Sequence, residues 1–240
     1  MVVVISQSMY FPWVGLLEQI RLADVFVHYD DVQFSRGSLV NRVQAKTGSG
    51  SKWLKVPLRD QHLGQLINEV RVDNRTDWRR KHRDLLCHAY QDAPFREEML
   101  SLIDGVLATD CETLADISRE SMMALVRYFG LDDGTIFQDS AQLGVSGSGS
   151  KRVHGICRAL GATVYVTGHG ARRYLDHDLF ERSRIRVEYM KYRMQRYPQL
   201  HGDFTPYVTG LDLVANCGRA GRSLICSGST SWQEFLSEAD

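Results

Sequence analysis

The sequence predicts an α/β fold with a mainly parallel, Rossmann-like sheet and a helical insertion. Residues 1–7 form a near-continuous run of apolar, mostly β-branched side chains, which is typical of a strand buried on both faces. Residues 13–24 carry apolar side chains at near-helical spacing, and residues 25–29 form a second apolar run. A strand, a helix and a strand within about thirty residues make a βαβ unit, whose two strands run parallel.

The rest of the chain continues this alternation. Residues 39–58 predict a β-hairpin around the turn TGSGS. The later elements are expected in the order strand 135–140, helix 146–162, strand 163–168, helix 169–183, extended segment 185–193 and helix 208–226. We therefore expect one α/β domain over residues 1–240, with a charged helical insertion at about 74–132.

Composition excludes several classes of protein. The 240 residues are 43% hydrophobic and 24% charged, which is ordinary for a globular protein. The 29 basic and 29 acidic residues balance, whereas a nucleic-acid-binding protein usually has a basic excess. No apolar run reaches the roughly 18–20 residues of a membrane span. The stretch MVVVIS is too short for a signal-peptide core and lacks a basic leader, so we expect it to be a strand. The five cysteines are scattered without zinc-site spacing. We expect a cytoplasmic protein with reduced thiols, no metal, no membrane span and no nucleic-acid partner.

Polar and aromatic side chains follow three of the predicted strands. In open parallel sheets, ligands bind outside the carboxyl ends of the strands. The residues expected at this rim are Gln7, Tyr10 and Trp13 after the first strand, Asp30, Asp31 and Gln33 after the second, and Thr167 and Gly168 after a later one. Their convergence predicts a site for a small-molecule substrate. Tyr10 and Trp13 either line a ring-stacking pocket or belong to the core.

Two groups of charged residues are candidates for the chemistry. Side chains of neighbouring strand residues point to opposite faces, so one of Asp30 and Asp31 is expected to enter the pocket. A carboxylate there can hold an amine, accept a proton or bind a metal; the alternative is a turn acid beside a helix cap. On the predicted hairpin, Asn41, Arg42 and Lys46 carry donors suited to a carboxylate or phosphate, or are surface residues.

Other motifs are weaker. His82 lies in RTDWRRKHRDLLCH and is a candidate acid or base, although a solvated helical face explains this cluster more simply. Residues 146–152 resemble a phosphate loop but fail the GxxxxGK[ST] test, because Ser150 separates Gly149 from Lys151. They predict an anion-tolerant loop. The patterns G-x-S-x-G, H-E-x-x-H and G-x-G-x-x-G do not occur.

Several stretches together resemble the WbqC-like protein family, over nearly the whole chain. They are QSMYFPWVGLLEQIRLADVFVHYDDVQF, NRVQAKT, WLKVP, GATVYVTGHGARRYLD and YPQLHGDFTPYVTGLDLVANCG. The family's signature positions fall here on Gln7, Tyr10, Pro12, Trp13, Gly15, Asp24, Asp30, Asp31, Gln33, Asn41, Arg42, Pro57, Gly168, Tyr174, Asp212, Asn216 and Gly218. This sequence departs from the family at Ser6-Gln7-Ser8, where His-Gln-Pro is usual, and its VTGLDLV weakens the usual LSIIDLL. A fainter likeness to pantothenate synthetase implies a nucleotidylyltransferase-like fold only, because that class's catalytic histidine pair is absent.

The family resemblance implies a role in O-antigen, other surface-polysaccharide or specialised-metabolite biosynthesis. We expect a transferase that moves an acyl or aminoacyl group to an amine such as an amino sugar. It needs no cofactor of its own, because the donor is a thioester on an acyl carrier protein or coenzyme. In this scheme Asp30 or Asp31 binds the amine, Gln7 and Asn41 bond the carbonyl, and Arg42 and Lys46 hold the donor.

Two other hypotheses remain open. One is a non-catalytic binding module for a carrier protein or biosynthetic enzyme. The other is phosphoryl or nucleotidyl transfer, which requires a metal that acidic residues alone cannot establish.

Overall fold

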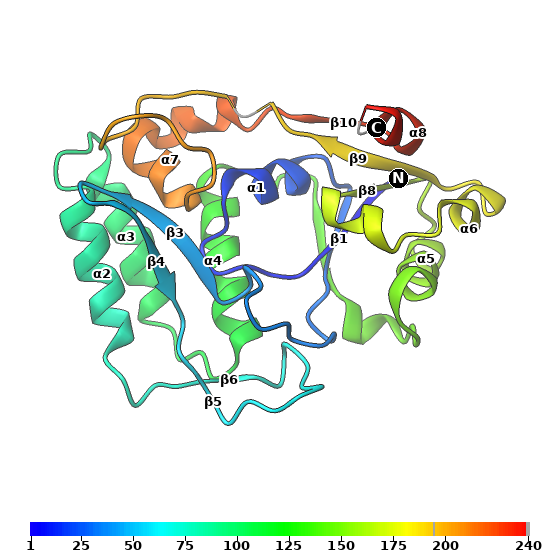
Figure 1. Ribbon diagram of the computed structural model, residues 1–240, viewed down its shortest axis with the longest axis horizontal. Coiled ribbons are helices and arrows are strands. Elements are labelled where there is room, and N and C mark those ends of the chain that lie inside the picture. Colours follow the sequence, from blue (N-terminus) through cyan, green and yellow to red (C-terminus); the bar gives the residue numbers. More distant parts are fainter. Residues whose placement is uncertain (194, 239–240) are drawn as a thin grey trace.

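A computed structural model describes residues 1–193 and 195–238. At its centre is a six-stranded sheet with the order β10-β9-β8-β1-β2-β7 (Figure 1). Its strands are β1 (Val2–Ser6), β2 (Val25–His28), β7 (Ile136–Asp139), β8 (Val164–Thr167), β9 (Arg186–Lys191) and β10 (Gly228–Ser231). Neighbouring strands are parallel except β9 and β10, which are antiparallel. The predicted α/β fold with a mainly parallel sheet is confirmed.

The strand order places a crevice at the middle of the sheet. The chain starts at β1 and builds β2 and β7 on one side of it. It then crosses back and adds β8, β9 and β10 on the other side. This is the Rossmann order, with its switch point between β1 and β8. Because Val4 pairs with Val166 in parallel register, the ends of β1 and β8 emerge side by side.

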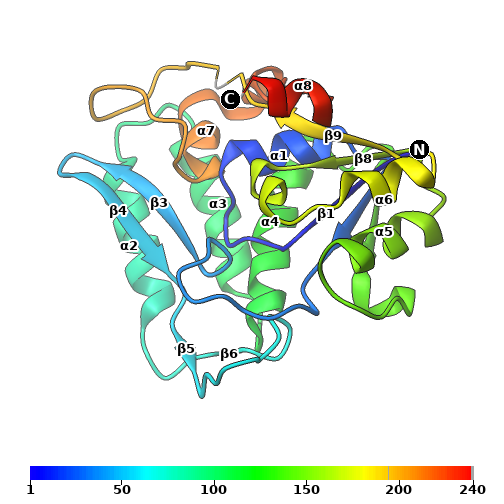
Figure 2. The ribbon, with the colours of Figure 1, turned by 45° about the vertical axis from the view of Figure 1, so that its right-hand side comes forward.

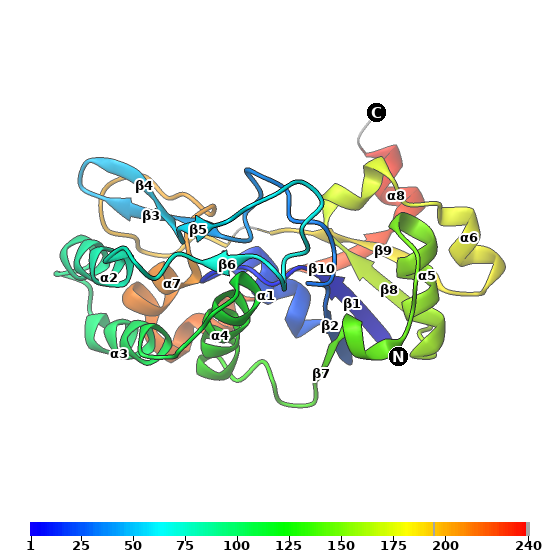
Figure 3. The ribbon, with the colours of Figure 1, turned by 90° about the horizontal axis from the view of Figure 1, so that it is seen from below.

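Helices cover both faces of the sheet (Figure 3). One layer contains α1 (Val14–Arg21), α4 (Leu114–Tyr128) and α7 (Gly210–Cys217); the other contains α5 (Gly149–Ala159) and α6 (His177–Arg182). Val4 and Phe26 belong to the core beneath the first layer, whereas Val3 and Val27 belong to the core beneath the second. Because both faces of the sheet are buried, successive residues in the middle of β1 and β2 are all apolar.

A long excursion separates β2 from β7. It contains the hairpin β3 (Arg42–Thr47) and β4 (Gly50–Lys55), the short pair β5 (Leu58–Arg59) and β6 (Arg71–Val72), and the helices α2 (Trp78–Ala89) and α3 (Arg96–Leu107) before α4. Figures 1 and 2 show the hairpin with α2 and α3 at the end of the molecule opposite α5 and α6. Most of the excursion therefore lies away from the crevice, although its residues Gln33 and Leu66 line it. The single-domain organisation remains a prediction.

The carboxyl-terminal part contains elements beyond the helix expected at residues 208–226. After α7 and the 3-10 segment η3 (Gly218–Leu224), the chain forms β10 and α8 (Trp232–Ser237). Two further 3-10 segments, η1 (Ser140–Leu143) and η2 (His169–Arg173), follow β7 and β8. The small polar residues of β10 give no strand pattern, and pairing with β9 decides their conformation. Among the described residues, no helix has the length and apolarity needed to cross a membrane.

The aromatic segment between β1 and α1 is mostly core. Tyr10 and Phe11 are fully buried. Phe11 has a φ of 38°, a left-handed conformation that costs a non-glycine residue about 1–3 kcal/mol. Two hydrogen bonds hold it there, because Ser121 Oγ accepts from the Phe11 N–H (2.9 Å) and Thr209 Oγ1 donates to the Phe11 carbonyl (2.9 Å). The segment is thus pinned between α4 and α7.

Replacing Thr209 by valine should lower the free energy of unfolding by about 1–3 kcal/mol, because the shape is kept but the Phe11 carbonyl loses its buried donor. Thr209 Oγ1 also accepts from the Leu211 N–H at the start of α7. Urea denaturation of the variant measures the change. Thr76→Val, at an exposed position, is the matched control and should shift stability by less than about 0.5 kcal/mol. Equal shifts in both variants would contradict the pinning.

Candidate functional site

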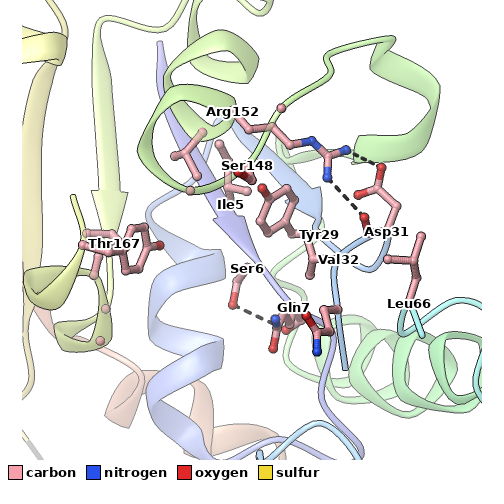
Figure 4. A pocket seen from close by; sticks show the side chains of 18 of the residues that line it. Ile5, Ser6, Gln7, Tyr29, Asp31, Val32, Leu66, Ser148, Arg152 and Thr167 are labelled. Atoms are coloured by element: carbon pink, nitrogen blue, oxygen red, sulfur yellow. Dashed lines mark hydrogen bonds and ion pairs between the residues drawn. The ribbon is translucent and has the colours of Figure 1, made fainter. Parts of the chain in front are cut away.

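A cavity of about 780 Å³ opens at the carboxyl ends of β1, β2 and β8 (Figure 4). Its polar lining includes Ser6, Gln7, Asp31, Ser148, Arg152 and Thr167. The volume lies within the range of small-molecule sites, about 300–1,000 Å³. The site therefore sits where strand order alone predicts a ligand.

The first helix does not offer its amino terminus to this cavity as a dinucleotide-binding helix would. Pro12 and Trp13 occupy the entry to α1, with Trp13 as its N-cap residue. The ring of Trp13 lies so close to Gly15 that a Cβ added there would be 2.2 Å from it. The Trp13 ring therefore covers the first turn of α1, and the start of this helix does not line the cavity.

Helix α5 takes that position instead. Gly147, Ser148 and Gly149 line the cavity, and Ser148 is the N-cap of α5 without a side-chain capping bond. Gly149 has a φ of 54°, which a residue with a Cβ rarely adopts. The first N–H groups of α5 and the positive end of its dipole favour an anion. The sequence predicted an anion-tolerant loop in this segment.

Asp31 is the best-anchored acidic group of the cavity. Arg152 forms an ion pair with its carboxylate and donates to its carbonyl (3.2 Å), and Ser140 Oγ donates to its second carboxylate oxygen. Arg152 also donates to the Val145 carbonyl (3.0 Å) and lies over the Tyr29 ring, 5.0 Å from its centre. Figure 4 shows Arg152 reaching from α5 to Asp31. Arg152 is thus committed to holding Asp31, and burial raises the pKa of Tyr29, which stays a neutral phenol.

Hydrogen-bond donors come from the ends of β1 and β8. The Gln7 side-chain amide lines the cavity and makes no hydrogen bond to another described residue. Thr167 is 6% exposed, and its Oγ1 accepts from the Tyr165 hydroxyl (3.2 Å). Its own proton is therefore free to be donated. Gly168 lines the cavity beside it, and Gln33 lies at the exposed rim.

Asp30 points away from its neighbour into a buried network. Its carboxylate accepts from the Ser8 N–H (2.9 Å), the Ser8 hydroxyl (2.8 Å) and Arg119 Nε (2.6 Å). Arg119 also pairs with Asp139, and Ser8 Oγ lies 2.9 Å from His28 Nδ1. Sequence reasoning missed this network, although His28 at the end of a buried strand was a signal. Burial, with the nearby Arg119 charge, lowers the pKa of His28 to about 4.

His82 lies in α2 and does not line the cavity. Its ring is 7% exposed, packs against Trp78, and has Nδ1 3.1 Å from the Tyr10 hydroxyl. Burial lowers the pKa of His82 to about 4. The geometry describes a neutral histidine that joins α2 to the segment after β1.

Asn41 and Lys46 are also buried away from the cavity. The Asn41 amide donates to the Val56 carbonyl (3.1 Å). Lys46 is 5% exposed and donates to Gln199 Oε1 (3.2 Å) and to the carbonyls of residues 202 and 203 (3.0 and 2.6 Å). Lys46 therefore fixes the segment after β9 against the hairpin.

Tyr10, Trp13 and Arg42 border a different, smaller pocket. Trp13 is half-buried and lies 5.1 Å from the Tyr192 ring. Arg42 lies over the Trp53 ring at 4.7 Å and donates to the Gly37 carbonyl. Among the described residues no group of three or more His, Cys, Asp or Glu side chains is placed to hold a metal ion.

The chain is an α/β protein with a Rossmann-type sheet and a cavity of small-molecule size at the switch point of that sheet. The WbqC-like protein family matches residues 7–223, and the chain belongs to this family. It is 33% identical over 219 residues to the uncharacterized protein Rv1507c of Mycobacterium tuberculosis, a match that covers 90% of this chain and 94% of that protein. No solved structure matches the chain. The family resemblance seen in the sequence is confirmed.

Two of the buried histidines, His28 and His82, predict a loss of stability in mild acid. Both have a folded pKa of about 4 against 6.5 for the free side chain. Between these values the unfolded chain binds protons that the folded chain does not. The free energy of unfolding should therefore fall as the pH drops from 6.5 to 4, by up to about 1.4 kcal/mol per pH unit for each histidine. It should show no histidine contribution above 6.5.

Urea denaturation from pH 7.5 to 4.5 measures this slope. His82→Gln keeps partners for Tyr10 but removes the titrating ring, so its slope should be flatter by about one proton. For each protein, the free energy of unfolding at pH 7.5 is the reference value. An unchanged slope would show that His82 is not held neutral.

Proposed function

We propose that the chain is a transferase that moves an acyl or aminoacyl group from a thioester donor to an amine acceptor such as an amino sugar. One observation carries the proposal: an anchored carboxylate, Asp31, and an unpaired amide, Gln7, line one cavity of small-molecule size. The Asp31 carboxylate can bind the amine of the acceptor, and the Gln7 amide can donate a hydrogen bond to the carbonyl of the donor. Membership of the WbqC-like family supports a role in the biosynthesis of a polysaccharide or specialised metabolite.

The amine binds as an ammonium group beside the Asp31 carboxylate and loses a proton to solvent water before it attacks. Attack on the thioester carbonyl forms a C–N bond and places negative charge on the carbonyl oxygen. The Gln7 amide and the Thr167 hydroxyl are the donors available for that charge. The attacking nitrogen then carries an acidic proton, which Asp31 accepts. The C–S bond breaks, and the thiolate leaves with the carrier.

The donor's phosphate is assigned to the start of α5, where residues 147–149 line the cavity. An acyl carrier protein or a coenzyme supplies such a phosphate on its flexible arm. Arg152 acts as a positioning residue, because its hydrogen bonds go to Asp31 and Val145. Asp30, His82, Asn41 and Lys46 have no role in this scheme, since their polar atoms are engaged elsewhere.

Asp31→Asn should lower turnover at least about 100-fold, because it removes the proton acceptor while keeping the shape. Gln7→Leu should cost a similar factor through the lost carbonyl donor. The assay combines acyl and aminoacyl thioesters of N-acetylcysteamine with UDP-linked amino sugars and follows thiol release and the amide by mass spectrometry. Asp133→Asn, at an exposed position, is the control and should retain full turnover.

Full turnover of Asp31→Asn would refute the assigned chemistry. Stabilisation by an acyl carrier protein, with no stabilisation by any thioester and no turnover, would favour the binding module instead. Melting temperature in the presence of each thioester, or of an acyl carrier protein, separates these cases, because a ligand at 100 times its dissociation constant stabilises by about 2.7 kcal/mol.

A further inference from the structure

The candidate cavity continues into two neighbouring hollows. A second space of about 730 Å³ shares Gln19 and Gly168 with it, and a third of about 260 Å³ shares Leu39 and Tyr207 with the second. Met9 lines all three. The three spaces therefore adjoin one another around Met9, between the switch point of the sheet and the β3–β4 hairpin.

The third of these spaces is an apolar pocket with exposed aromatic walls. Leu39, Trp53 and Tyr207 line it and are 43%, 48% and 59% exposed. Large apolar side chains that gather around one hollow, and are not buried by the fold, are a feature of ligand sites. Arg42 contributes charge to the wall, but it is stacked on Trp53. The pocket thus offers contact area and little polarity.

The inner wall of the pocket is rigid. Trp13 is held between Gly15, where a Cβ would be 2.2 Å from its ring, and Tyr192, 5.1 Å away. Tyr10 behind it is fully buried. A wall that cannot collapse keeps the pocket open before a ligand arrives, which lowers the cost of binding.

We infer that this pocket, lined by Met9, Trp13, Leu39, Trp53 and Tyr207, binds the apolar end of the transferred group. The substrate class is a thioester of a medium-chain or aromatic acyl group, or of an aminoacyl group with an apolar side chain. This inference rests on the proposed function. The carbonyl lies near Gln7, and the tail passes Met9 into the apolar pocket. At about 260 Å³ the pocket is too small for a whole donor and suits a tail.

Direct binding tests the inference without any amine acceptor. The probes are the acetyl, butyryl, hexanoyl, octanoyl and phenylacetyl thioesters of N-acetylcysteamine, measured by calorimetry and by tryptophan emission. Dissociation constants should fall about fourfold for each methylene buried, until the pocket is full. Emission should shift to the blue as Trp53 and Trp13 lose water. Equal affinity for acetyl and hexanoyl thioesters would overturn the inference.

A matched pair of variants locates the tail. Leu39→Asp places a charge at the pocket and should weaken hexanoyl binding at least about tenfold, with little effect on acetyl binding. Leu63→Asp makes the same change at a residue that is 95% exposed and lines none of the three spaces, and it should bind like the unaltered protein. Equal affinities of the two variants for the hexanoyl thioester would place the tail elsewhere.

The inference and the proposed function can fail separately. Chain-length-dependent binding, lost in Leu39→Asp, without transfer to any amine would retain the apolar subsite and refute the transferase. Transfer of acetyl groups, with no tighter binding of longer acyl groups, would retain the transferase and refute the apolar subsite.

Discussion

Asp30 and Asp31, just after β2, form ion pairs with both helical layers and hold them against the sheet. Asp30 pairs with Arg119 of α4, on one face, and Asp31 pairs with Arg152 of α5, on the other. Because successive residues of an extended chain point to opposite sides, one dipeptide serves both layers. Arg152 is the side chain that joins α5 to the end of β2, so the position of α5 at the cavity depends on its contacts with Asp31.

The segment after β1 decides where a ligand can bind. In a dinucleotide-binding protein the first turn is open, but here Trp13 closes the start of α1 and α5 faces the cavity. The family's usual His-Gln-Pro reads Ser6-Gln7-Ser8 in this chain. Ser8 donates both its N–H and its hydroxyl to Asp30, and a proline there has no N–H to donate. Ser6 lines the cavity and brings a hydroxyl group to it.

Local patterns were enough to predict the layers. The apolar runs of β1, β2 and β8 and the helical periodicity around them identified the parallel sheet, because burial on both faces leaves a signal in each short segment. The strand β10 and the helix α8 were missed. Thr230 and its neighbours are small and polar, and β10 exists only because β9 offers it an unpaired edge.

The sequence by itself determined the fold class, the family and the strand ends at which a site belongs. It did not determine which polar side chains reach that site. Asp31 and Gln7 line the cavity. Asp30 and Lys46 also suited a ligand by their charge, but they form hydrogen bonds with residues from distant segments instead. Such partners are dozens of residues away along the chain. Only the packing of α4, α5 and the segment after β9 against the sheet decides which polar side chains line the cavity and which lie in buried networks away from it.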